Sequence, residues 1–98
     1  MTVRERLDAM VDMAVMELKM RKTQKYGTAT DGVYPMMTGD VWTSGGIISG
    51  VQIFPPDIHA VAKEVGAKVI SNGYELYFMY RGIAFFSYNR RRFNALYC

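Results

Sequence analysis

Apolar positions recur at helical spacing near the start of the chain. The segment from Thr2 to about Lys22 opens with a capping-box pattern, because Glu5 follows Thr2 by three residues. At about 100° per residue, one apolar set gathers on the side expected to face the core. This set comprises Val3, Leu7, Met10, Val11, Ala14 and Leu18. A second, shorter helix is predicted from Pro56 to Val65, where Gly66 would end it.

The first predicted helix also carries an apolar stripe on nearly the opposite side, formed by Ala9, Met13, Met16 and Met20. Charged residues, Glu17 among them, separate the two stripes. A helix that is apolar on two opposed sides needs two partners. The second stripe is covered either by the loop that follows in the same chain or by another protein, and the sequence leaves both alternatives open.

Alternating aromatic and β-branched residues predict a three-stranded antiparallel meander over residues 67–88. Asn72-Gly73 indicates a two-residue hairpin loop, in which both residues need positive φ. Arg81-Gly82 predicts the second turn. The expected cross-strand pairs are Ser71 with Tyr74, Ile70 with Glu75, Tyr80 with Ile83, Phe78 with Phe85 and Tyr77 with Phe86.

Side chains alternate across a strand, so this register divides the meander into two faces. The expected core face carries Val69, Leu76, Phe78, Tyr80, Ile83 and Phe85. The second face carries Lys68, Ile70, Glu75, Tyr77, Met79, Ala84, Phe86 and Tyr88. A solvated sheet face is normally more polar than this. We therefore expect a helix of the chain, a second copy or a ligand to cover it.

The remaining segments complete a single α+β domain over residues 1–98. Residues 23–46 are rich in Gly, Thr, Asp and Ser and predict a long loop, with one short strand near Val33 to Met37. A further strand is predicted from Ile47 to Phe54. Residues 89–98 form a basic and aromatic tail. The predicted fold is a long N-terminal helix and a second short helix, packed on a small antiparallel sheet that ends in the meander.

Composition argues against several classes of function. The chain has one His and one Cys, too few for a structural zinc site or a Cys/His catalytic pair. The glycines from Gly39 to Gly50 lack the Lys-Ser or Lys-Thr of a phosphate loop. His59 beside Asp57 is better interpreted as a helix-surface residue than as a general base. We therefore expect no enzyme and no cofactor. The lone cysteine and the lack of an apolar run long enough for a bilayer favour a cytoplasmic protein.

The surplus of apolar faces favours a protein-binding module that occupies a partner surface and self-associates, most simply as a homodimer. The candidate interface residues are Met13, Met16, Met20, Tyr77 and Phe86. This compact size is typical of inhibitors and adaptors, including those encoded by phages or mobile elements, and that origin is a hypothesis from size alone.

Single-stranded nucleic-acid binding is the alternative function. Aromatic rings on an open sheet face can stack with bases while arginines contact phosphates. The candidate residues are Tyr77, Phe86, Tyr88, Arg81, Arg90, Arg91 and Arg92. The net charge of +3 is too small to indicate nucleic acid by itself. A solvated basic turn beside a partly buried sheet face explains the same pattern.

Overall fold

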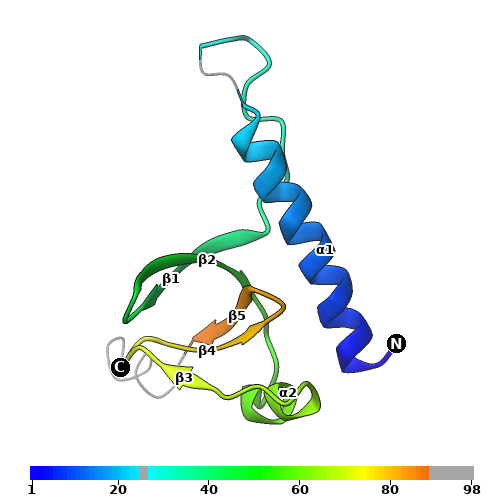
Figure 1. Cartoon of the computed structure of the whole chain (residues 1–98), viewed down its shortest axis with the longest axis vertical. Coiled ribbons are helices and arrows are strands. Elements are labelled where there is room, and N and C mark those ends of the chain that lie inside the picture. Colours follow the sequence, from blue (N-terminus) through cyan, green and yellow to red (C-terminus); the bar gives the residue numbers. More distant parts are fainter. Residues whose placement is uncertain (25–26, 89–98) are drawn as a thin grey trace.

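The computed structural model describes residues 1–24 and 27–88 (Figure 1). Within these ranges lie two helices and five strands, which confirms the predicted α+β class. In chain order they are α1 (Val3–Lys22), β1 (Thr38–Thr43), β2 (Gly46–Gln52), α2 (Ile58–Glu64), β3 (Ile70–Ser71), β4 (Glu75–Tyr80) and β5 (Ile83–Tyr88). The basic and aromatic tail, with Arg90, Arg91 and Arg92, lies outside the described residues.

The five strands form one sheet in the order β1-β2-β5-β4-β3. The sheet is mixed, because β2 pairs with β5 in parallel while the other neighbours are antiparallel. The expectation of an antiparallel sheet is therefore wrong at this one junction. After β2 the chain leaves the sheet through α2, and a connection of this kind lets it return in its original direction.

The first strand lies inside the segment that the sequence predicted as a loop. β1 runs from Thr38 to Thr43, just after the short strand expected near Val33 to Met37, and forms a hairpin with β2 in which Thr43 pairs with Gly46. The expected strand position is wrong because hydrogen bonding to β2 selects the next six residues. Pairing with a neighbour outweighs the low strand propensity of Gly39 and Asp40.

The first hairpin of the meander has a different register from the predicted one. Ser71 pairs with Leu76 and Ile70 with Tyr77, a shift of two residues that keeps every side chain on its expected face. Gly73 has positive φ but Asn72 does not, so the loop is not type I′. Instead the Asn72 side-chain oxygen accepts hydrogen bonds from the backbone N–H groups of Tyr74 and Glu75. The second hairpin has the predicted register, with Tyr80 opposite Ile83.

Both helices pack on the predicted core face of the sheet. Phe78 and Phe85 are fully buried there, and their rings stack with centroids 5.5 Å apart. The same cluster includes Leu7, Val11, Ala14, Val51, Ile58, Ala62 and Ile83. Burying each large side chain contributes about 1.5–3 kcal/mol. The capping box of α1 is confirmed, since the Glu5 N–H donates to Thr2 Oγ1 over 3.1 Å and the Thr2 N–H donates to Glu5 Oε1 over 3.2 Å.

The second face of the sheet is covered by the sheet itself. Val41, Tyr77, Ala84 and Phe86 form a separate buried cluster there, with Ile48 packed against it. The sheet curls so far that Asn72 Nδ2, beside one edge strand, donates a hydrogen bond to the Trp42 carbonyl of the other edge strand over 3.1 Å. Figure 1 shows β1 and β2 bending over the remaining strands. Neither a second copy nor a ligand is needed to bury these rings.

Two glycines lie against this inner cluster, and only one of them is needed for its close packing. Gly39 and Gly50 are cross-strand partners beside the Phe86 ring. A Cβ on Gly50 would lie 2.6 Å from Val41 Cγ2 and 3.0 Å from the Ala84 carbonyl oxygen, whereas a Cβ on Gly39 would meet the ring at an ordinary 3.6 Å. The β2 backbone can therefore approach Val41, the Ala84 carbonyl and the Phe86 ring only because residue 50 has no side chain.

Candidate protein-interaction surfaces

The second apolar stripe of α1, residues Ala9, Met13, Met16 and Met20, is called the methionine face below. Met13 is 56% exposed and Met16 is 52% exposed, while Met20 is half-buried. Thus the loop that follows α1 leaves the centre of the methionine face uncovered. On the opposite side of the helix, Leu7, Val11 and Ala14 are buried in the core.

Two polar side chains of α1 and one just after it hold the segment that returns toward the sheet. Gln24 Oε1, just beyond the helix, accepts from the Gly32 N–H over 2.9 Å. The guanidinium of Arg21 lies 5.1 Å from the centroid of the Tyr34 ring. Glu17 accepts hydrogen bonds from the Met37 N–H, the Thr38 N–H and the Thr38 hydroxyl. We call residues 15–24 together with 27–37 the arm, which projects beyond the sheet in Figure 1.

Glu17 is fully buried, although the sequence places it in a charged lane beside the methionine face. Burial favours a raised pKa, but the hydrogen bonds from Thr38 and Met37, together with the Arg21 charge at 3.6 Å, outweigh it and lower the pKa of Glu17. The carboxylate thus fixes the start of β1 to α1. Sequence reasoning missed this role, and the one available signal was that Glu17 lies between Ala14 and Leu18 of the core stripe.

A second polar cluster fixes the β4–β5 turn to the N-terminal half of α1. Asp8 Oδ1 accepts from the Tyr80 hydroxyl over 2.7 Å and from Arg81 Nη1 over 3.2 Å, and Arg81 Nη2 lies 3.7 Å from Asp12. The Tyr80 hydrogen bond lowers the pKa of Asp8, an effect to which Arg81 adds, and the same bond raises the pKa of Tyr80. Arg81 is thereby engaged with α1.

Of the residues proposed for nucleic-acid binding, the four that the structure describes do not gather on one open surface. Tyr77 and Phe86 are each only 5% exposed, inside the cluster on the second face. Arg81 binds carboxylates of α1, which packs on the other face. Tyr88 is 50% exposed. The burial of Tyr77 and Phe86 also removes them from an accessible protein interface, so Met13 and Met16 are the exposed members of that candidate set.

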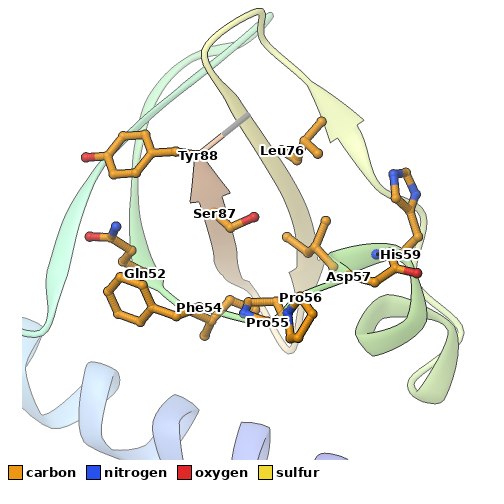
Figure 2. A pocket seen from close by; sticks show the side chains of 11 residues that line it. Gln52, Phe54, Pro55, Pro56, Asp57, His59, Leu76, Ser87 and Tyr88 are labelled. Atoms are coloured by element: carbon orange, nitrogen blue, oxygen red, sulfur yellow. Dashed lines mark hydrogen bonds between the residues drawn. The ribbon is translucent and has the colours of Figure 1, made fainter. Parts of the chain in front are cut away.

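A cleft of about 330 Å³ lies where the β2–α2 connection meets the ends of β4 and β5. Figure 2 shows Gln52 and Tyr88 on one side, Asp57 and His59 on the other, and Ser87 between them. Asp57 Oδ1 caps α2 by accepting from the His59 backbone N–H over 3.0 Å. Within the described parts of the chain, no hydrogen bond links the His59 imidazole to Ser87 or Asp57. The cleft therefore shows no assembled nucleophile and base.

A second groove, of about 450 Å³, lies between the end of β1 and the β3–β4 turn. Its lining combines three aromatic rings, two carboxylates and one amide: Trp42, Tyr74, Tyr88, Asp40, Glu75 and Asn72. Trp42 is 63% exposed and Tyr74 is 60% exposed, while Glu75 is buried. Asn72 Nδ2 donates to Glu75 Oε1 over 3.0 Å and so fixes the carboxylate beside the rings.

Comparison with protein-family models, with curated proteins and with solved structures finds no match to this chain. Among the described residues, no helix is long and apolar enough to cross a bilayer. The same residues contain no group of three or more His, Cys, Asp or Glu side chains placed to bind a metal ion. The surfaces of the chain are therefore the basis for inferring its function.

Proposed function

We propose that this protein is a non-enzymatic protein-binding module that self-associates through the methionine face of α1 and acts, like an inhibitor or adaptor, by occupying a partner surface. The exposure of Met13 and Met16 carries the proposal. Both lie opposite the buried side of the same helix, where a soluble helix is normally polar. Methionine is flexible and polarisable, and it suits surfaces that adapt to a partner.

The charges beside the methionine face favour a second copy of the chain in antiparallel orientation. Asp12 and Lys19 are seven residues apart, so they lie within about 20° of each other around the helix axis. In an antiparallel pair centred between Met13 and Met16, Asp12 and Lys19 of the second copy lie within about 3 Å of each other along the axis. Two symmetric ion pairs would then flank the paired methionines. Opposed helix dipoles favour the same orientation.

Sedimentation velocity at tens of micromolar tests the proposal. We expect a dimer for the natural chain and a monomer for the double variant Met13→Glu with Met16→Glu, with the dissociation constant raised at least about tenfold because charge is placed in the centre of the interface. Val15→Glu is the matched control, since Val15 is 41% exposed on the same helix but outside the methionine face. A monomeric natural chain, or equal weakening by the control, would contradict the proposal.

A charge exchange tests the orientation separately. Asp12→Lys alone and Lys19→Asp alone each bring like charges together and should weaken the dimer. The two substitutions combined should restore it. Asp12 also lies 3.7 Å from Arg81 within its own chain, so recovery in the combined variant distinguishes pairing between chains from a local effect. If the combined variant is weaker than either single one, the helices do not pair antiparallel.

A further inference from the structure

The groove between the end of β1 and the β3–β4 turn combines features suited to a cation. Three aromatic side chains line it, and the negative faces of aromatic rings attract cations. Two carboxylates, Asp40 and Glu75, lie among them, and the described residues of the lining include no Lys or Arg. The groove is thus acidic and aromatic in a chain whose formal net charge is +3.

The two carboxylates differ in their exposure to solvent. Glu75 is 8% exposed. Its Oε1 accepts a hydrogen bond from Asn72 Nδ2 and its backbone N–H donates one to Asn72 Oδ1, so two contacts hold it in place. Asp40 is exposed at the opposite wall. In the part of the chain that the structure describes, the ion pairs of carboxylates involve Asp8, Asp12 and Glu17, and neither groove carboxylate takes part. A buried carboxylate gains more from a cation than an exposed one does, because solvent screens it less.

The structure points to this groove as a binding site for an arginine side chain in a basic segment of a partner protein. Guanidinium fits better than ammonium, since it is planar, stacks on aromatic rings and donates two parallel hydrogen bonds to a carboxylate. The inference deepens the protein-binding function proposed above by naming the chemistry of the partner segment. The groove and the methionine face are formed by different elements, so the two surfaces can be tested independently.

Trp42 is the only tryptophan of the chain, so its fluorescence reports on this groove directly. The 98-residue chain is titrated with an acetylated tetra-arginine amide, with tetra-lysine and tetra-glutamate peptides for comparison. We expect a saturable change in Trp42 emission with tetra-arginine, weaker binding of tetra-lysine and no binding of tetra-glutamate. Raising the salt concentration should weaken the complex, because the attraction is electrostatic and the groove is open.

Substitutions locate the site. Asp40→Asn should weaken binding about three- to tenfold, since it removes one of two attracting charges. Asp40 is exposed, so this variant tests the groove without disturbing the fold. Glu64→Gln, which removes an exposed carboxylate on α2, is the matched control and should bind as the natural chain does. Glu75→Gln should weaken binding further, provided that its thermal unfolding midpoint is unchanged.

Three results would overturn the inference. They are no saturable fluorescence change, equal binding of tetra-glutamate, or equal affinity in the natural chain and Asp40→Asn. Binding that appears only when Arg90, Arg91 and Arg92 are replaced by Gln would assign the groove to the chain's own arginines in place of a partner's. The monomeric variant Met13→Glu with Met16→Glu should bind tetra-arginine normally, so failure of self-association and failure of this site are separate outcomes.

Discussion

The curled sheet and the arm are stabilised by different kinds of interaction. The sheet buries aromatic rings on both faces, with Phe78 and Phe85 on one side and Tyr77 and Phe86 on the other. Within the arm, residues 27–37 are held to residues 15–24 chiefly by polar contacts, those of Glu17, Arg21 and Gln24. Hydrophobic burial of a large side chain is worth more than a typical hydrogen bond or a partly exposed ion pair.

This contrast shows where the molecule can accommodate function. A segment with few buried apolar contacts opens locally at little cost, while the core unfolds only as a whole. The arm also exposes apolar side chains of its own, since Val33 is 72% exposed and Met36 is 82% exposed. We infer that the sheet supplies the stability and that the arm, with the methionine face, supplies adaptable surface for a partner.

Removing a core ring should have the largest effect. Phe85→Ala is expected to reduce the free energy of unfolding by about 3–5 kcal/mol, because Phe85 is fully buried and a cavity remains in its place. Urea denaturation followed by circular dichroism measures the change. Phe54→Ala is the control, since Phe54 is 79% exposed and should change stability little. Similar losses for both variants would show that exposure in this structure does not describe the core.

The inner face of the sheet can be tested with two glycines that pair across β1 and β2. Gly50→Ala should cost about 1–3 kcal/mol, because the new methyl group would overlap Val41 and approach the Ala84 carbonyl, which belongs to the backbone and cannot rotate away. Gly39→Ala should cost much less, since its methyl group would meet Phe86 at an ordinary distance. Equal losses for the two would contradict the described curl.

Local signals explain the parts of the fold that the sequence predicted. The Thr2 and Glu5 capping box starts α1. Successive side chains of β4 and β5 point to opposite faces of the sheet, which assigns each residue to its face. Both depend on residues close together in the chain. The exposed position of Met13 and Met16 follows from the helical spacing of apolar residues in α1, which places them opposite the core stripe.

The parts that the sequence did not predict depend on distant partners. β1 forms because β2 pairs with it, and the first hairpin takes its register from hydrogen bonds of the Asn72 side chain. Tyr77 and Phe86 are predicted as binding residues from the sequence because nothing local indicates that the sheet curls over them. Likewise, the burial of Glu17 depends on Thr38, twenty-one residues away. The acidic groove arises from the same curl.

Glu17 tests the junction between arm and sheet. Glu17→Gln should reduce stability at neutral pH by about 1–2 kcal/mol, since charge-assisted hydrogen bonds to Thr38 and Met37 become neutral ones. Because the folded pKa of Glu17 is lowered, its contribution is complete above the unfolded glutamate pKa of about 4.3 and is lost as pH falls through the folded pKa. The stability difference between natural chain and variant should therefore shrink in acid. A difference that is constant from pH 7 to pH 3 would contradict this role.

The smallest global effect is expected for the contact between Arg21 and Tyr34 within the arm. Tyr34→Leu removes a cation–π contact worth about 0.5–1 kcal/mol, and the sheet does not depend on it. Amide hydrogen exchange measured by mass spectrometry should become faster for the backbone N–H groups of Gly32 and Met37, which the arm's other hydrogen bonds protect. Exchange in β4 and β5 should be unchanged. If Tyr34→Leu instead lowers the urea midpoint as much as Gly50→Ala does, arm and sheet unfold as one cooperative unit, and the contrast between them does not hold.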